Sequence, residues 1–388
     1  MIIIKKPELQ IEADWAIISV IFIMEGKEER LWYKIPVKFR KFLVTENVDA
    51  FLVGLLFLGL KTGNDIILES PVSERLHYTL NHYVIKALCL ANPQLKPIKI
   101  HAVHLNSMSL NISGFAGTGL SCGVDSLATY YDHIGEKGQF NIEYFTYCNA
   151  GSHGDFGGAN SRKIFFERLN SVKKFADYED KDIIAIDSNI SEILKMNFQQ
   201  THTFRNISCI LNLQKLFKNY YYASGYRFDY FRLNKDVTSD ADILYLSMLS
   251  TESLDLFSSV NYMNRRERTE FISKFPKTYS TLDVCTNPLQ ANKFKNCSSC
   301  EKCMRTALTL QLLDKLHYYK EVFDIEIFLK QKDKFIGQLV INRNLNESNK
   351  DLYNFLKKEN AFILKHFLEA LKYKITQSKN ALKKKCSL

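Results

Sequence analysis

The sequence has no hydrophobic run long enough to cross a membrane: the longest, residues 51–60, is about half the length that a spanning helix needs. Residues 1–6 lack the basic region and the small-residue cleavage site of a secretory signal. Cys386 is followed by only two residues, so the C-terminus does not match a prenylation box. We therefore expect a cytoplasmic protein with no membrane span, whose cysteines are mostly reduced.

The chain also lacks internal repeats, long low-complexity segments and a strongly basic domain. It has 388 residues, of which 46% are hydrophobic and 13% aromatic, and this composition excludes a disordered protein. More than half of the formal net charge of +10 lies in residues 365–388, which contain seven lysines and one glutamate. Such a tail can bind an acidic partner, a membrane or nucleic acid, or it can be a solvated end. We expect no nucleic-acid partner.

The residue pattern divides the chain into three predicted domains. Residues 1–110 contain strand signals at 16–23 and 31–37 and helix signals at 48–60 and 74–90, which indicate an α+β accessory domain. Residues 111–283 alternate strands and helices, which favours a parallel sheet with crossover helices. Residues 284–388 begin with a cysteine cluster and continue as helices, with apolar residues at helical spacing that we expect to be core: Leu352, Phe355, Leu356, Phe362, Phe367, Leu368 and Leu371.

The middle segment carries the α/β prediction. Its expected strands are 117–120, 142–147, 183–186, 220–223 and 243–249. Its expected helices are 126–133, 161–176 and 205–217. Sheets of this kind bind ligands beyond the carboxyl ends of their strands.

A candidate phosphate loop joins the first strand and helix of this segment. It has the sequence Ser121-Cys122-Gly123-Val124-Asp125-Ser126. Gly123 allows a turn that is closed to most residues, and Asp125 or Ser126 can cap the helix that follows. Backbone N–H groups and the positive end of the helix then form an anion site. No Gly-Lys-Ser/Thr follows, so the segment is not a Walker loop.

This loop resembles the Ser-Gly-Gly-x-Asp-Ser loop of the PP-loop (N-type) ATP pyrophosphatases. The departure is Cys122, where the family usually has glycine, and a cysteine cannot adopt the full glycine range of backbone angles. The resemblance implies that Ser121, Cys122, Gly123, Val124, Asp125 and Ser126 bind the nucleotide, with Asp125 and Ser126 as catalytic residues.

Four cysteines form a second motif. Cys285, Cys297, Cys300 and Cys303 have the spacing C-x11-C-x2-C-x2-C, and Pro288 lies in a loop that lets Cys285 fold back. Four thiolates complete a tetrahedral zinc site, so we expect structural Zn²⁺ here. An iron–sulfur cluster, a redox pair and ordinary core cysteines are the alternatives.

Together, the two motifs resemble those of the 7-cyano-7-deazaguanine synthase-like proteins, over residues 113–310. The resemblance implies an α/β parallel sheet of the adenine-nucleotide α-hydrolase (HUP) type. The implied enzyme is a ligase that uses ATP and Mg²⁺ to adenylate a carboxylate, releases pyrophosphate, and forms an amide or nitrile with ammonia or an amine while AMP leaves. The extra N-terminal domain and the long C-terminal helices depart from the family and bear on the substrate.

Further candidate residues lie on other loops. His202 and Arg205 precede or open a predicted helix, and Gly225 follows a predicted strand, so each is a candidate nucleotide contact. Helix capping, a solvated arginine and a simple turn are the alternatives. The charged run of residues 265–268 is typical of a solvated helix face.

Two other functions remain open from the sequence. The same ATP chemistry could serve sulfur transfer, which Cys122 keeps open. Alternatively, the loop could bind nucleotide without catalysis in a protein-modifying assembly. The expected partner is a small-molecule carboxylate or a polypeptide substrate, and a homodimer is not excluded.

Overall fold

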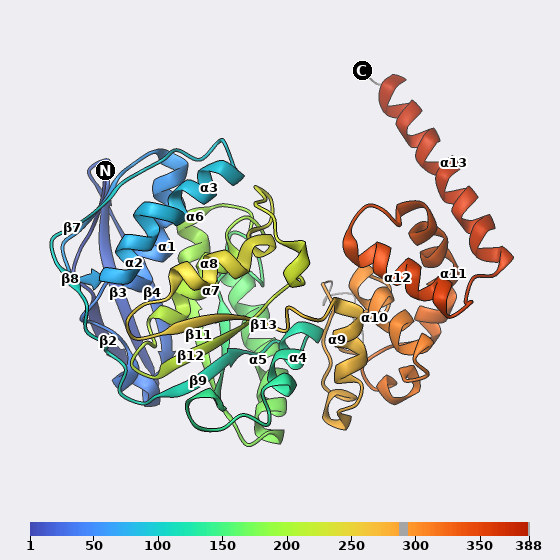
Figure 1. The fold of residues 1–388 in the computed structure, drawn as a ribbon, viewed down its shortest axis with the longest axis horizontal. Coiled ribbons are helices and arrows are strands. Elements are labelled where there is room, and N and C mark those ends of the chain that lie inside the picture. The colour runs from blue at the N-terminus through green and yellow to red at the C-terminus, as the bar shows by residue number, and fades with distance from the viewer. Residues whose placement is uncertain (287–293, 387–388) are drawn as a thin grey trace. The chain divides into compact units, whose positions relative to one another are not determined.

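The computed structural model describes residues 1–286 and 294–386 (Figure 1). It contains two compact units. Unit 1 consists of Met1–Ser121 and Thr129–Tyr262, and unit 2 of Cys122–Ala128 and Met263–Leu388. Unit 1 thus holds the predicted accessory segment together with most of the predicted α/β segment. No helix in the described ranges is both long enough and apolar enough to cross a membrane.

Unit 1 is built on an eleven-stranded mixed sheet in the order β13-β12-β9-β10-β11-β4-β3-β1-β5-β7, with β2 paired to β3. A separate two-stranded sheet pairs β6 with β8. The strands are β1 (Ile2–Ile4), β2 (Glu8–Glu12), β3 (Trp15–Met24), β4 (Lys27–Pro36), β5 (Ile66–Leu68), β6 (Val72–Ser73), β7 (Ile100–Ala102), β8 (Leu105–Asn106), β9 (Phe115–Gly119), β10 (Ile142–Asn149), β11 (Asp182–Ser188), β12 (Phe217–Ala223) and β13 (Asp255–Ser259).

The strands from β9 to β13 pair with one another in parallel, as the alternating pattern predicted. In this parallel part of the sheet, β9 lies in the centre. The next two strands along the chain, β10 and β11, lie on one side of it, and β12 and β13 lie on the other. The order therefore reverses between β9 and β12, and sheets of this kind bind ligands outside the carboxyl ends of the strands at such a point. The candidate phosphate loop directly follows β9.

Gly117 in β9 is required by close packing. A Cβ atom at this position would lie 2.3 Å from Cε1 of Phe217, a ring that is completely buried. Because the aromatic ring is rigid, a side chain at residue 117 would displace β12 from β9.

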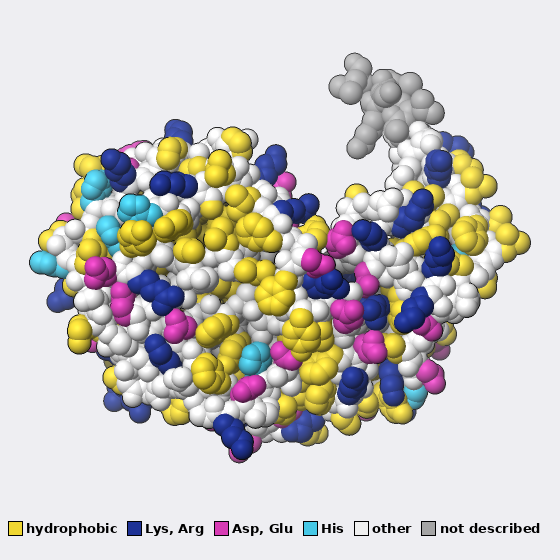
Figure 2. Space-filling model, viewed as in Figure 1, with side chains coloured by type: hydrophobic (Ala, Val, Ile, Leu, Met, Phe, Trp, Pro, Cys, Tyr) yellow, Lys and Arg dark blue, Asp and Glu magenta, His cyan; other side chains and the backbone are white. Residues whose placement is uncertain are grey.

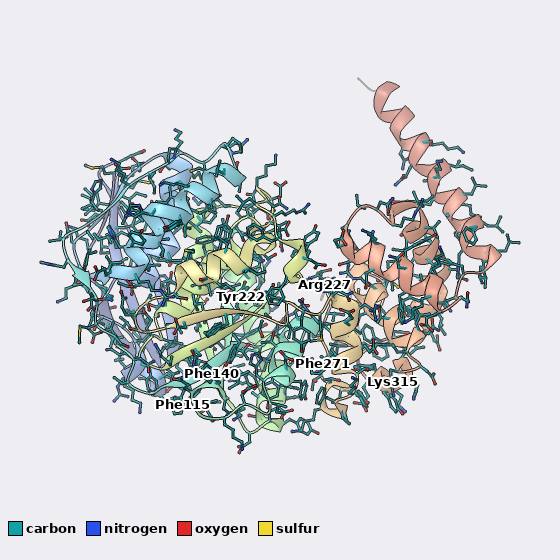
Figure 3. The ribbon with its side chains drawn as sticks, viewed as in Figure 1. Phe115, Phe140, Tyr222, Arg227, Phe271 and Lys315 are labelled. Atoms are coloured by element: carbon teal, nitrogen blue, oxygen red, sulfur yellow. The ribbon has the colours of Figure 1, made fainter. Side chains whose placement is uncertain are left out.

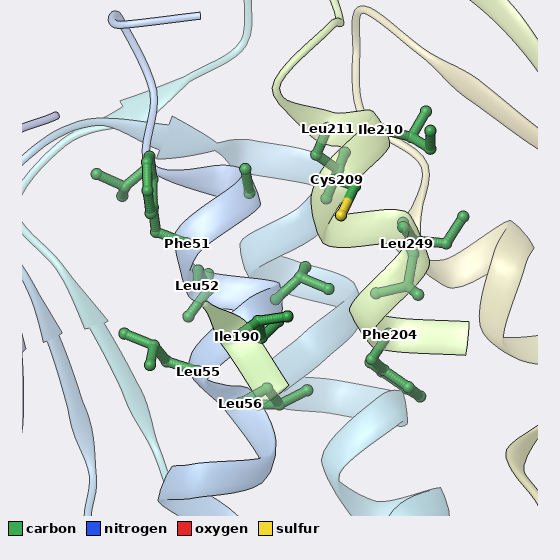
Figure 4. Packing of buried hydrophobic residues seen from close by; sticks show 14 of the residues in the cluster. Phe51, Leu52, Leu55, Leu56, Ile190, Phe204, Cys209, Ile210, Leu211 and Leu249 are labelled. Carbon is green, nitrogen blue, oxygen red and sulfur yellow. The ribbon is translucent and has the colours of Figure 1, made fainter. Parts of the chain in front are cut away.

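The N-terminal strands continue the same sheet. β4 pairs antiparallel with β11 through Asp187↔Lys34 and Ser188↔Tyr33. The helix α1 (Asp49–Thr62) is buried all round and packs on α7 (His202–Leu211). Figure 4 shows this packing, with Phe51 and Leu55 of α1 in the same apolar cluster as Phe204 of α7. Residues of the predicted domains 1–110 and 111–283 therefore share one hydrophobic core.

The other helices of unit 1 are α2 (Glu74–Thr79), α3 (Ile85–Ala91), α5 (Ala159–Tyr178), α6 (Ile190–Leu194) and α8 (Asp242–Leu249), while α4 (Val124–Asp132) belongs to both units. The prediction of a strand at 243–249 was wrong, because this segment is α8. The predicted helix 205–217 also ends earlier, at Leu211, and Phe217 opens β12. A short run that is apolar all round does not distinguish a buried helix from a buried strand.

Unit 2 is helical apart from the cysteine-rich loops. Its helices are α9 (Arg265–Ile272), α10 (Glu301–Leu312), α11 (Ile325–Asn342), α12 (Glu347–Lys358) and α13 (Leu364–Cys386). Leu352, Phe355 and Leu356 are buried, as expected. The expectation that Phe367, Leu368 and Leu371 are core was wrong, because each is about half exposed on α13.

Candidate functional site

The phosphate loop connects β9 to α4. Ser121 is exposed, whereas Cys122 and Val124 are buried. The hydroxyl of Ser126 donates to the carbonyl oxygen of Gly123 at 3.2 Å, and the N–H of Leu127 donates to the same oxygen at 3.0 Å. These bonds close the first turn of α4, a helix long enough for its positive end to attract an anion.

Cys122 has a left-handed backbone, with φ of 56°. This is the conformation that glycine adopts without a steric penalty, and glycine is the residue expected here from the PP-loop resemblance. The thiol is only 2% exposed, and burial raises the pKa of Cys122 to about 12. The side chain is therefore a protonated thiol at neutral pH.

Asp125 is held by two arginines from α9. Arg265 binds both carboxylate oxygens, with Nη2 on Oδ2 and Nε 3.4 Å from Oδ1, and Arg268 Nη1 lies 2.8 Å from Oδ1. Burial alone would raise the pKa of Asp125, but the charges and hydrogen bonds of Arg265 and Arg268 lower it to about 2. Asp125 is therefore ionised at neutral pH.

A capping box determines where α9 begins. Asn264 accepts from the N–H of Glu267 at 2.9 Å, and Glu267 accepts from the N–H of Asn264 at 2.8 Å. Arg265 and Arg268 then lie one turn apart on the same side of the helix. The expectation that this charged run is solvated was wrong for Arg268, whose side chain is 0% exposed, while the side chain of Arg265 is 27% exposed.

Lys302, in the first turn of α10, adds a third cation to this part of unit 2. Its side chain interacts electrostatically with Asp125 and Arg265. The loop carboxylate therefore has three basic side chains around it, although burial lowers the pKa of Lys302, and the carboxylate of Asp283 acts on the neighbouring Cys122. In the sequence, Lys302 lies between Cys300 and Cys303. For Arg265 and Arg268, the sequence signal was their i, i+3 spacing, which places both on one side of a helix.

The four cysteines meet in one cluster. All four Sγ atoms lie within 4.8 Å of one another, including 3.3 Å from Cys300 to Cys303 and 3.9 Å from Cys297 to Cys303. Four thiolates about 2.3 Å from a zinc ion would lie about 3.8 Å apart in tetrahedral geometry. The N–H groups of Cys297 and Cys300 point at sulfurs, at 3.4 and 3.3 Å, which favours thiolates. The cluster can therefore bind a metal such as zinc. The expected loop around Pro288 lies outside the described residues.

A short hydrogen-bonded path joins this cluster to the phosphate loop. The N–H of Asp283 donates to the carbonyl oxygen of Cys122 at 2.8 Å. Asp283 Oδ1 in turn accepts from the N–H of Cys285 at 3.2 Å. The backbone of the loop is thus held by a residue two positions before a candidate metal ligand.

The remaining predicted residues belong to unit 1. Arg205 is fully buried, and its guanidinium donates to the carbonyl oxygens of Asp155 and Met196, at 2.9 and 2.8 Å. This burial gives no support to a phosphate contact by Arg205. His202 Nδ1 lies 2.9 Å from the hydroxyl of Thr238.

Gly225 lies in the loop that follows β12, the parallel neighbour of β9 (Figure 3, which marks Tyr222 and Arg227 around it). Nucleotide contacts by Gly225 and His202 stay predictions.

Comparison of the chain with known proteins gives no match. No protein-family model matches the chain, and neither the curated proteins nor the solved structures contain a match.

Proposed function

We propose that the chain is an ATP pyrophosphatase-type ligase that binds ATP at the loop of residues 121–126. The observation that carries the proposal is the arrangement of Asp125 between Arg265 and Arg268, beside Lys302 and at the N-terminus of α4. Basic side chains beside a helix N-terminus suit a polyphosphate. The order of β9–β13 further supports a nucleotide-binding sheet of the HUP type, with its ligand beyond β9.

In the proposed reaction, a substrate carboxylate oxygen attacks the α-phosphorus of ATP. The bond from this phosphorus to the bridging oxygen breaks, and pyrophosphate leaves with its electron pair. Ammonia or an amine then attacks the acyl carbon, AMP leaves, and a proton is released from nitrogen. Loop N–H groups and Lys302 are suited to stabilise the charge on the leaving phosphates. Mg²⁺ on the phosphates would supply further neutralisation.

The structure gives no support to sulfur transfer through Cys122. A sulfur carrier needs an accessible thiolate, whereas this thiol is buried and its pKa is raised to about 12. By resemblance, 7-carboxy-7-deazaguanine is the first substrate to test.

The test is to follow labelled ATP in the presence of Mg²⁺ and ammonium, with and without 7-carboxy-7-deazaguanine. We expect AMP and pyrophosphate, and we expect Ser121→Ala to reduce their formation by roughly tenfold or more, since a lost hydroxyl contact to a charged phosphate costs on the order of 1.5–3 kcal/mol. Ser378→Ala, which alters an exposed hydroxyl on α13, is the matched control. Formation of ADP would indicate another phosphate chemistry, and ATP binding without turnover would indicate a binding module.

A further inference from the structure

Over its described side chains, residues 364–380, the helix α13 packs on α11 through one face. His366 Nε2 lies 3.2 Å from Asp333 Oδ1 on α11, and Asn342 donates to the hydroxyl of Tyr373 at 3.3 Å. The two helices come close together at Gly337, where an added Cβ would lie 2.7 Å from the backbone nitrogen of Ala370. These contacts determine which side of α13 faces α11.

The other face of α13 is apolar and exposed. Four residues, which we call the outer seam, have exposed fractions between 48% and 75%: Leu364, Leu368, Leu371 and Ile375. Their spacing of four, three and four residues is that of the a and d positions of a coiled coil, and Phe367, 49% exposed, borders them. Figure 2 shows hydrophobic side chains beside lysines along this helix.

Lysines accompany the outer seam at heptad intervals. Lys365, Lys372 and Lys379 occupy successive e positions when Leu364 and Leu371 are d positions. Lys365 contacts Asp333 and Lys372 contacts Glu369, both at 2.7 Å. Even so, residues 325–342 and 364–380 together hold seven lysines against three carboxylates, so these two segments carry a positive excess.

We propose that the outer seam docks an amphipathic helix of a partner protein, with acidic residues flanking an apolar heptad seam. Residues at e and g determine which helices pair, and lysines there favour glutamate or aspartate on the partner. A second copy of α13 would bring lysines against lysines. A membrane surface is matched by a broader apolar face, whereas the outer seam has the narrow a/d pattern of helix pairing. This docking does not depend on the phosphate chemistry.

The experiment uses the full chain and two synthetic heptad peptides with leucine at a and d. One peptide has glutamate at e and g, and the other has lysine there. Fluorescence anisotropy measures binding of each peptide at low and high salt. We expect the acidic peptide to bind roughly tenfold or more tightly than the basic one, with a preference that shrinks as salt rises.

Two variants separate the apolar and ionic contributions. Leu368→Glu/Leu371→Glu should abolish binding, and Lys372→Glu/Lys379→Glu should reverse the preference toward the basic peptide. Leu345→Glu, at a residue that is 74% exposed and outside α13, should change nothing. All the altered side chains are substantially exposed, so folding should be preserved, which circular dichroism would check.

Three results would overturn the proposal. The first is equal binding of both peptides, or of neither. The second is association with phosphatidylserine vesicles that the Leu368→Glu/Leu371→Glu variant loses, with no peptide preference. The third is self-association of the full chain through the outer seam, measured by sedimentation at the protein concentrations used in the peptide titrations.

Discussion

The two units reach stability by different physical means. Unit 1 has a continuous sheet and an apolar core in which α1 is buried on all sides. Unit 2 contains a cysteine cluster and an ion pair between Asp125 and the buried Arg268. Apolar burial responds little to metal or acid, whereas thiolate ligation and ion pairs respond to both. The following predictions therefore perturb one unit and use the other as reference.

Metal removal should give the largest difference between the units. A structural zinc site contributes on the order of 10 kcal/mol or more to folding, so a chelator or Cys300→Ser should unfold the cysteine-rich part of unit 2. Since Asp283 holds the carbonyl of Cys122, hydrogen exchange should also rise in the phosphate loop. Exchange in β10 and β11 should stay unchanged.

The control is Cys89→Ser, which alters a lone cysteine of unit 1. Metal content should fall in the Cys300 variant and stay constant in the control. Full metal content together with native exchange in the Cys300 variant would refute a structural metal at these cysteines.

Asp125→Ala should have the next largest effect. It leaves Arg268, which is 0% exposed, as a buried charge without its carboxylate, and such losses cost about 3–5 kcal/mol. Hydrogen exchange in α9 should report this loss. A matched change, Asp229→Ala, removes an exposed ion pair with Arg227 in unit 1 and should have little effect on stability.

A result below about 1 kcal/mol for Asp125→Ala would show that the pair contributes little to stability. For the same reason, loss of ATP turnover in this variant has to be judged against its folding. The Ser121→Ala variant avoids this difficulty because Ser121 is exposed.

Acid should affect the contributions of Asp49 and Asp125 in opposite directions. In unit 1, burial raises the pKa of Asp49 to about 6, so the folded state takes up a proton before the unfolded state does. The contribution of Asp49 should therefore rise by about 2 kcal/mol as the pH falls from 7 to 4, while burial lowers the pKa of His153 to about 4 and makes its contribution fall over the same range. In unit 2, the pKa of Asp125 is lowered to about 2, so its contribution of about 2 kcal/mol persists above pH 4 and is lost as the pH falls toward 2.

Local exchange free energies at several pH values would measure both trends. Asp49→Asn should remove the gain in unit 1 without altering the loss in unit 2. The same dependence of unit 1 stability on pH in the parent chain and in Asp49→Asn would contradict the raised pKa of Asp49.

Gly117→Ala tests the apolar unit by packing alone. The added methyl group would overlap the ring of Phe217, which should cost about 2 kcal/mol. Gly135→Ala is the control, because nothing lies within 4 Å of its added Cβ. The cost should be independent of metal and should diminish in the double variant with Phe217→Leu. An equal effect at both glycines would mean that β9 and β12 have room to adjust.

The sequence predicted features that are formed by residues close together in the chain better than contacts between residues far apart in it. The phosphate loop and the cysteine cluster are short segments, and apolar runs predicted β10 and β11. The pairing of Asp125 with Arg265 was missed because the two residues are separated by 140 positions and a charged helix usually faces water. The exposed leucines of α13 were missed because helical spacing shows that residues share a face, but not what that face contacts.

The smallest predicted effect concerns Cys122, where the loop departs from glycine. A left-handed conformation costs a non-glycine residue about 1 kcal/mol, and Cys122→Gly removes that cost while losing the buried thiol and adding freedom to the unfolded chain. We expect these terms to cancel within about 1 kcal/mol, with ATP affinity preserved. Cys122→Val, which is β-branched, should lower stability and weaken ATP binding, because valine resists this conformation more strongly. Thermal unfolding and ATP titration of both variants would measure this. If valine were tolerated as well as glycine, the loop would not depend on the left-handed residue, and the likeness to a glycine-bearing phosphate loop would lose its structural basis.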